Sequence, residues 1–169
     1  MLEDVVDLVA DMTLVRACLV VPDGSDPAVA DVGWPGMPVV AAPDRRLGSV
    51  VAALAALGAD EAGVVVPDAP DLPALLLGKL HSALTSAEVA VCPAADGRLV
   101  AAAARVPLAP WAHAVTLDDA DALGALQAGA PHRALHIGAG WHRVGSEADA
   151  RRLDVGLEGW ERTRALLGF

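Results

Sequence analysis

Residues 64–73, Val-Val-Val-Pro-Asp-Ala-Pro-Asp-Leu-Pro, constrain the fold of this chain more than any other stretch. Three β-branched residues in a row are typical of a buried strand, and the prolines and aspartates after them predict a turn. In open α/β sheets, ligands bind in the crevice outside the carboxyl ends of such strands. Asp68 therefore stands where a functional carboxylate is expected. Two structural roles stay open: Asp68 bracing the turn, and Asp71 capping the helix that follows.

Short apolar runs alternate with helical patterns along the whole chain. Strands are expected at residues 17–21, 37–42, 63–66, 88–92, 99–104 and 132–137. Helices are expected at residues 2–11, 47–57, 72–84, 118–128, 146–153 and 157–167. Asp118, Asp119 and Asp121 would lie in the first turn of the fourth helix, where the helix dipole favours acids. The alternation predicts βαβ units and an α/β fold with a mostly parallel sheet, in a single domain spanning residues 1–169.

Three loops that follow strands combine proline with aspartate, and parallel topology would bring them to one sheet edge. They are residues 43–46, with Arg45 and Arg46; residues 67–71; and residues 93–97, with Asp96 and Gly97. Three such loops at corresponding strand ends indicate a site. The arginines would hold a phosphate or remain solvated charges. Trp141, in a glycine-rich loop, would stack on a base or sugar or pack within its loop.

The charge balance of the chain excludes several classes of partner. The formal net charge is −10 and Lys79 is the only lysine, so no basic stripe is present for nucleic acid or an anionic membrane. No uncharged apolar run reaches the length of a membrane span, and the acidic N-terminus does not resemble a signal peptide. Hydrophobic residues make up 54% of the chain but aromatic residues only 3%. The apolar excess suggests a homodimer interface.

Two cysteines, Cys18 and Cys92, lie in apolar strand-like runs. They are expected to be buried free thiols, which fits a reducing cytoplasm. With no histidine cluster beside them, they do not form a zinc site. Ser146 and Asp149 have the spacing of a helix capping box.

The order of motifs resembles a known family. A strand leads into Pro-Asp-Ala-Pro-Asp-Leu-Pro, then come a helix, a strand leading into Cys-Pro-Ala-Ala-Asp-Gly, and another strand. This resembles the glycosyltransferase-like family associated with radical-SAM and selenium gene clusters, within the nucleotide-diphospho-sugar transferase (GT-A) superfamily. It is more distantly similar to molybdenum-cofactor and 2-phospholactate guanylyltransferases. The resemblance implies a three-layer α/β/α sandwich in which Asp68 holds Mg²⁺ or Mn²⁺ on nucleotide phosphates, with Asp71, Asp96 and Gly97 near the substrate.

The chain also departs from these families. Their first strand and phosphate-gripping loop have no counterpart here, so the domain is expected to be N-terminally shortened. The Asp-x-Asp-Thr-type segment of the guanylyltransferases aligns with Arg143-Val-Gly-Ser146, which lacks both aspartates. Mg²⁺ commonly takes two carboxylates together with substrate phosphates, so Asp68 alone is one carboxylate too few. The first expectation is a nucleotidyl- or glycosyltransferase-like protein that binds a nucleotide or nucleotide-sugar through a metal at Asp68. The alternative is a non-catalytic relative that acts as a binding or partner subunit.

Overall fold

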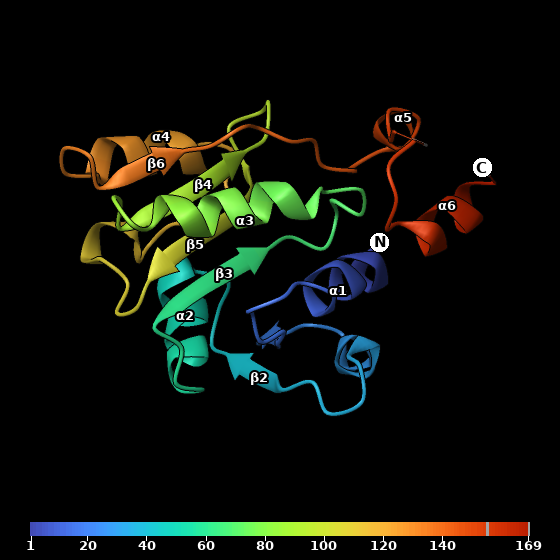
Figure 1. The fold of residues 1–169 in the computed structure, drawn as a ribbon, viewed down its shortest axis with the longest axis horizontal. Coiled ribbons are helices and arrows are strands. Elements are labelled where there is room, and N and C mark those ends of the chain that lie inside the picture. The colour runs from blue at the N-terminus through green and yellow to red at the C-terminus, as the bar shows by residue number, and fades with distance from the viewer. Residues whose placement is uncertain (155, 169) are drawn as a thin grey trace.

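The computed structural model describes residues 1–154 and 156–168, which form a mixed α/β structure (Figure 1). The helices are α1 (Leu2–Ala10), α2 (Leu47–Ala55), α3 (Ala74–Ala83), α4 (Ala122–Gly129), α5 (Glu147–Ala150) and α6 (Glu161–Leu167). The strands are β1 (Leu19–Pro22), β2 (Val39–Ala42), β3 (Glu61–Val65), β4 (Val89–Pro93), β5 (Leu99–Arg105) and β6 (Leu135–Ile137). Short 3-10 turns lie at Pro27–Val32 and Pro110–Ala112.

The strands form two sheets. β1 and β2 pair in parallel, and the other four strands are ordered β3-β5-β4-β6. β5 is antiparallel to both β3 and β4, whereas β4 and β6 are parallel. The prediction of a mostly parallel sheet is therefore wrong for the larger sheet. The cause is the short turn at residues 94–98, which lets β5 return beside β4 as a hairpin instead of crossing over through a helix.

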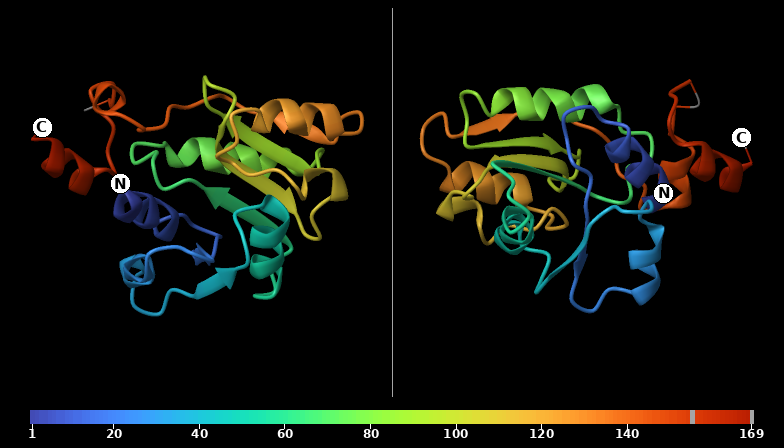
Figure 2. Two further views of the ribbon diagram at one scale, coloured as in Figure 1. Left: turned by 180° about the vertical axis from the view of Figure 1, so that it is seen from behind. Right: turned by 60° about the horizontal axis from the view of Figure 1, so that its bottom comes forward.

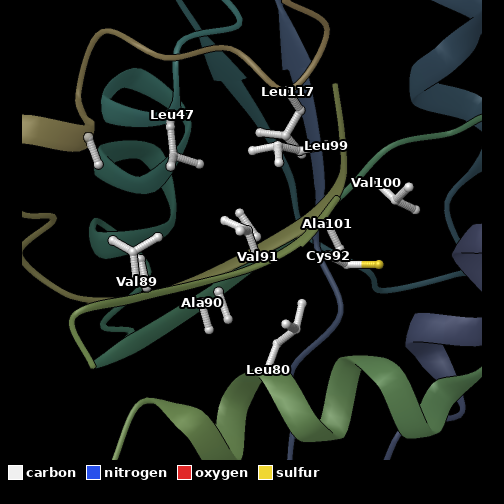
Figure 3. Packing of buried hydrophobic residues seen from close by; sticks show 14 of the residues in the cluster. Leu47, Leu80, Val89, Ala90, Val91, Cys92, Leu99, Val100, Ala101 and Leu117 are labelled. Atoms are coloured by element: carbon white, nitrogen blue, oxygen red, sulfur yellow. The ribbon is translucent and has the colours of Figure 1, made fainter. Parts of the chain in front are cut away.

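Helices cover both faces of the larger sheet. Figure 3 shows Leu47 of α2 on one side of β4 and β5, and Leu80 of α3 on the other. Since residues along a strand alternate between faces, Val91 points to the side of α2 and Ala90 to the side of α3. All three strand residues from Ala90 to Cys92 are fully buried. A fully buried strand reads as an unbroken apolar run, as the sequence does here.

Small side chains make the centre of the core. Residues 101–104 of β5 are four consecutive alanines, all buried. Alanine buries little area, so the large side chains that close the core come from the helices and neighbouring strands, such as Leu84, Val89 and Leu126. The core is therefore built mainly from alanine, valine and leucine.

Several predicted boundaries shift. α1, α2 and β5 match their expected ranges closely, and Gly58 ends the α2 segment with a φ of 85°. α4 begins at Ala122 instead of residue 118, so Asp118 lies in the loop before the helix. α5 is only four residues long, but its Ser146 side chain accepts a hydrogen bond from the Asp149 backbone, which confirms the capping prediction.

The C-terminal helix α6 packs against α1, away from the larger sheet (Figure 2). The buried carboxylate of Asp4 on α1 accepts hydrogen bonds from the backbone N–H groups of Arg162 and Thr163 and from the Thr163 hydroxyl. Asp4 therefore satisfies the first turn of α6, where backbone donors have no helical partner. No helix in the described part of the chain has the length and apolar character needed to cross a membrane.

Candidate functional site

The candidate site lies where β3, β4 and β6 end. These three strands run in the same direction, because β5 is antiparallel to β3 and β4, and β6 is parallel to β4. Their carboxyl ends therefore meet at one edge of the sheet, as do the first residues of β5. The loop after β3 carries Asp68 and Asp71, and the loop after β6 carries Trp141, His142 and Arg143.

Backbone hydrogen bonds fix the loop after β6 against the other two strand ends. The Trp141 N–H donates to the Pro93 carbonyl at 3.0 Å, and the Val144 N–H donates to the Asp68 carbonyl at 2.7 Å. Gly140 permits this course, because a Cβ at that position would lie 2.9 Å from the Pro93 carbonyl oxygen. Residues 141–143 therefore lie beside the turn after β3.

Arg143 is the centre of the site. Its Nε lies 2.9 and 3.0 Å from the two carboxylate oxygens of Asp68, and its Nη2 lies 2.9 Å from Oδ2 of Asp68 and 2.6 Å from Oδ1 of Asp118. Its Nη1 donates to the carbonyls of Leu99 and Leu117, each at 3.3 Å. The side chain is only 5% exposed. A guanidinium offers five donors in a planar fork, and every nitrogen of this one is paired.

The charges around Arg143 are balanced. Asp68 and Asp118 contribute two negative charges, Arg143 one positive charge, and Arg45 a second positive charge at 3.4 Å from Asp118. Burial acts to raise the pKa of Asp118, but the hydrogen bond and charge of Arg143, followed by those of Arg45, outweigh burial and lower it. Burial likewise acts to lower the pKa of Arg143, and the two aspartates more than reverse this. Asp118 and Arg143 are therefore both charged at neutral pH.

Asp71 anchors a second cluster. Its side chain is fully buried and accepts hydrogen bonds from Nε1 of Trp141 at 3.2 Å and Nε2 of His142 at 2.9 Å. The two rings stack with centroids 4.9 Å apart. The helix-cap role left open for Asp71 is wrong, since α3 begins after Pro73 with no side-chain cap. Asp71 instead ties the turn after β3 to the loop after β6, and Trp141 packs within the protein.

The other predicted site residues separate into two groups. Arg45 joins the Arg143 network through Asp118, but Arg46 pairs with Asp44 of its own loop. Asp96 accepts hydrogen bonds from the backbone N–H and the guanidinium of Arg98, a residue of its own turn. Asp68 and Arg45 are therefore the predicted site residues that the described contacts join in the Arg143 network.

Gly97 serves the turn between β4 and β5. Its φ is 86°, a left-handed conformation that favours glycine. A Cβ there would lie 2.3 Å from the Ala120 carbonyl oxygen, and the Gly97 carbonyl accepts a hydrogen bond from the Leu123 N–H. The turn is therefore packed against the start of α4.

The site does not fit a divalent metal in this arrangement. Both oxygens of Asp68 are engaged by Arg143, and the neighbouring carboxylate, Asp118, is bound to the same Nη2 atom. Among residues 1–154 and 156–168, no group of three or more His, Cys, Asp or Glu side chains could hold a metal ion. Mg²⁺ and Ca²⁺ take oxygen ligands that are free to coordinate. A guanidinium here takes the place between the carboxylates that a cation would need.

Comparisons with known proteins agree with the fold. No family model matches the chain, and no curated protein matches it in sequence. Among solved structures, it is similar to the crystal structure of a proposed nucleotide-diphospho-sugar transferase from Desulfovibrio desulfuricans G20. The TM-score is 0.66 at 18% sequence identity, over 99% of this chain and 80% of that one. The chain therefore has a nucleotide-diphospho-sugar transferase-like fold.

Sequence reasoning missed two of the functional partners. Asp118 was assigned to a helix, because three acids before an apolar stretch predict a helical first turn. Arg143 enters the sequence analysis only through its alignment with the Asp-x-Asp-Thr-type segment of the guanylyltransferases that the chain resembles. The signal that could have joined Arg143 to Asp68 is that alignment, because an arginine where the resemblance expects a carboxylate can pair with Asp68.

Proposed function

We propose that this chain is a nucleotide-diphospho-sugar transferase-like domain that binds a nucleotide or nucleotide-sugar without a divalent metal and does not catalyse transfer. It corresponds to the non-catalytic alternative of the sequence analysis. The observation that carries the proposal is the buried guanidinium of Arg143 between Asp68 and Asp118. The fold shared with the Desulfovibrio protein supports a nucleotide or nucleotide-sugar as the class of ligand.

The absence of metal chemistry follows from the cost of moving Arg143. A metal at Asp68 would have to displace a guanidinium that makes hydrogen bonds through all three of its nitrogens. Removing one partner from such a buried ion pair commonly costs about 3–5 kcal/mol. Without a metal, the leaving phosphate of a donor would lack the charge neutralisation that the metal supplies. Binding without transfer is the outcome.

Positive charge for phosphates would come from the loop before α2. Arg45 and Arg46 are both more than half exposed, and Arg45 already lies beside the network. Each makes an ion pair on only one side, so a phosphate can approach the outer N–H groups. Arginine suits this role because its fork matches phosphate oxygens.

A metal-dependent transferase is the second candidate, and the convergence of two carboxylates supports it. Asp68 and Asp118 both lie within 2.9 Å of Nη2 of Arg143, so their oxygens converge on one point. If substrate binding drew Arg143 away, these carboxylates together with substrate phosphates would form a set that Mg²⁺ or Mn²⁺ accepts. This candidate retains the predicted metal ligand Asp68.

Two further expectations belong to the proposal. A cytoplasmic location is supported by the two free thiols, Cys18 and Cys92. A homodimer is supported by exposed apolar side chains such as Leu14, Trp34 and Val39. The proposal also takes both sheets as parts of one three-layer α/β/α domain.

A thermal-shift panel of nucleotides and nucleotide-sugars tests the proposal, with EDTA or Mn²⁺, on wild type, Asp68→Asn and Arg45→Ala. A ligand at 100 times its Kd should stabilise the protein by about 2.7 kcal/mol. We expect a shift with one nucleotide class that is equal in EDTA and Mn²⁺ and smaller in Arg45→Ala. A shift that needs Mn²⁺ and disappears in Asp68→Asn would establish the second candidate instead. No shift with any compound would overturn both.

A matched control for Arg45→Ala is Arg151→Ala. Arg151 is also an exposed arginine in an ion pair, with Glu147 on α5, and it lies outside the network. Its loss changes the net charge of the protein by the same amount. A nucleotide shift reduced equally in both variants would mean that bulk charge, and not the position of Arg45, controls binding.

A further inference from the structure

The outer edge of β3 is open. The register pairs Ala62 with Ala104 and Val64 with Ala102, and the Val66 N–H donates to the Val100 carbonyl. In an antiparallel pair every second residue exchanges hydrogen bonds with the partner strand. Even-numbered residues of β3 therefore bond to β5. The N–H and C=O groups of Glu61, Gly63 and Val65 point the other way, to the side where no strand of the described chain pairs with β3.

β1 has a similar open edge. The Leu19 N–H donates to the Pro38 carbonyl and the Asp23 N–H to the Ala42 carbonyl, so odd-numbered residues face β2. The backbone groups of Val20 point away from β2. β1 pairs only with β2 among the strands of the described residues.

A cavity of about 750 Å³ joins these two edges. It is lined by the whole of β3 and by β1 residues 19, 20 and 22. Its walls are apolar side chains of three helices: Val5 and Val9 of α1, Val50 and Leu54 of α2, and Leu77 and Leu80 of α3. Figure 1 shows α1 and β2 on the same side of β3, the side opposite to β4. The lining is therefore mainly apolar, and the outward backbone donors and acceptors of β3 lie along one edge of it. Its acidic and basic side chains are Arg16, Arg45, Glu61, His81 and Asp118.

We propose that this cavity is the docking site of an extended apolar strand from a partner polypeptide, which pairs with the open edge of β3. An apolar small molecule would fill the walls but leave the outward N–H groups of Gly63 and Val65 unpaired, which is costly once the occupant excludes water from them. A strand satisfies both requirements, because its backbone pairs with the edge while its side chains enter the walls. Since the walls are apolar on both faces of β3, the strand should carry apolar residues at consecutive positions, such as valine and isoleucine.

The length of β3 agrees with this occupant. β3 is five residues long, so its edge matches a strand of about five residues, roughly 17 Å. Arg45 and Asp118, two residues of the Arg143 network, also line this cavity, whereas the open edge of β3 takes no part in that network.

The test measures binding of a labelled peptide of about five valine and isoleucine residues, flanked by lysines for solubility, by fluorescence anisotropy. The control peptide has the same sequence with every second amide N-methylated, which keeps its charge and side chains but removes backbone donors. We expect binding of the first peptide and at least about tenfold weaker binding of the second, since two or more hydrogen bonds are lost. Equal binding of both peptides, or no binding, would overturn the proposal.

Two protein variants locate the site. Val65→Pro removes an N–H that points to the cavity, and proline is tolerated where an edge N–H has no ladder partner. Val39→Pro is the matched control: Val39 is an edge valine of β2 whose N–H also points outward, but it does not line the cavity. We expect weaker peptide binding only in Val65→Pro. Equal loss in both variants would place the peptide elsewhere. If light scattering shows that the chain self-associates, and self-association displaces the bound peptide, a second copy of the chain is the occupant instead.

Discussion

The guanidinium of Arg143 binds the carboxylate of Asp68 in a fork, with Nε and Nη2 2.9 to 3.0 Å from its oxygens. The two residues are 75 positions apart in the chain, and the pair closes the edge of the sheet where β3 and β6 end. A relative with aspartate at the position of Arg143 would present two acids to a cation. In this chain the cation is part of the protein.

Replacing Arg143 by methionine should strongly destabilise the protein. Methionine keeps the buried aliphatic volume but leaves Asp68 and Asp118 without their shared partner, and two carbonyls lose a donor. The expected loss is about 3 kcal/mol in the free energy of unfolding, measured by urea denaturation. Arg151→Met is the control, since its ion pair with Glu147 is exposed and should contribute less than about 1 kcal/mol. A loss below that control value would mean that solvent already screens the Arg143 network.

The same Arg143→Met variant should gain a response to divalent metal. With the guanidinium gone, Asp68 and Asp118 face one position with oxygens free to coordinate. We expect millimolar Mn²⁺ to raise the melting temperature of this variant, whereas the wild type should not respond. Adding Asp68→Asn to Arg143→Met should remove the gain. A wild type that responds to Mn²⁺ as strongly as the variant would contradict the assignment of Arg143 as the resident cation.

Gly97→Ala should destabilise the turn between β4 and β5 through backbone strain and through a steric clash. Gly24→Ala, which has the strain without the clash, separates these two causes. Both glycines have a positive φ, 86° and 82°, so both alanines suffer the left-handed strain of about 1 kcal/mol. Only at position 97 would the new methyl meet a backbone atom, the Ala120 carbonyl oxygen at 2.3 Å. Nothing lies within 4 Å of a Cβ at Gly24. We expect Gly97→Ala to lose roughly 1–3 kcal/mol more than Gly24→Ala in urea denaturation, and equal losses would show that α4 shifts freely.

Apolar periodicity predicted most of the elements but not how the sheet is connected. The run from Val89 to Cys92 and the valines before Pro67 identify buried strands whichever way their neighbours run. Direction depends on the connection, and the five residues between β4 and β5 are too few for a crossover. A helical pattern between the two strands, directly after residue 93, would have indicated a crossover to a parallel strand, but none is present there. The hairpin could have been predicted from this spacing.

For the site residues too, the sequence predicted local position but not long-range partners. Position after a strand correctly placed Asp68 at the sheet edge, because the end of a strand is a local property. The partners of Asp68 and Asp71 come from residues 118 and 141–143, and no local pattern specifies such a pairing. Asp71 illustrates this limit: its spacing before α3 favours a cap, but burial against His142 and Trp141 decides its role. Tertiary contacts override a local preference worth about 1 kcal/mol.

Acid should weaken the fold partly through Asp118. Its folded pKa lies below its ordinary value: burial raises the pKa, and Arg143 and then Arg45 lower it by more. A lowered folded pKa adds stability that is present above the unfolded pKa, near 3.8, and is lost as pH falls through the folded value. Asp118→Asn should therefore flatten the fall in melting temperature between about pH 5 and pH 3. Asp31→Asn, at an exposed position, is the control, and an unchanged slope in Asp118→Asn would contradict the role of Asp118.

Cys92 should be nearly inert to thiol reagents, whereas Cys18 should react. Cys92 is fully buried on β4, and desolvation raises its pKa to about 11, so little thiolate forms near neutral pH. Burial also raises the pKa of Cys18, with Arg16 opposing it, but Cys18 is partly exposed. At pH 8 we expect one thiol per chain to react quickly with a disulfide reagent, and the second only at the rate of global unfolding. Cys18→Ser should abolish the fast phase, and a fast phase that survives in Cys18→Ser but disappears in Cys92→Ser would show that the core opens locally at β4.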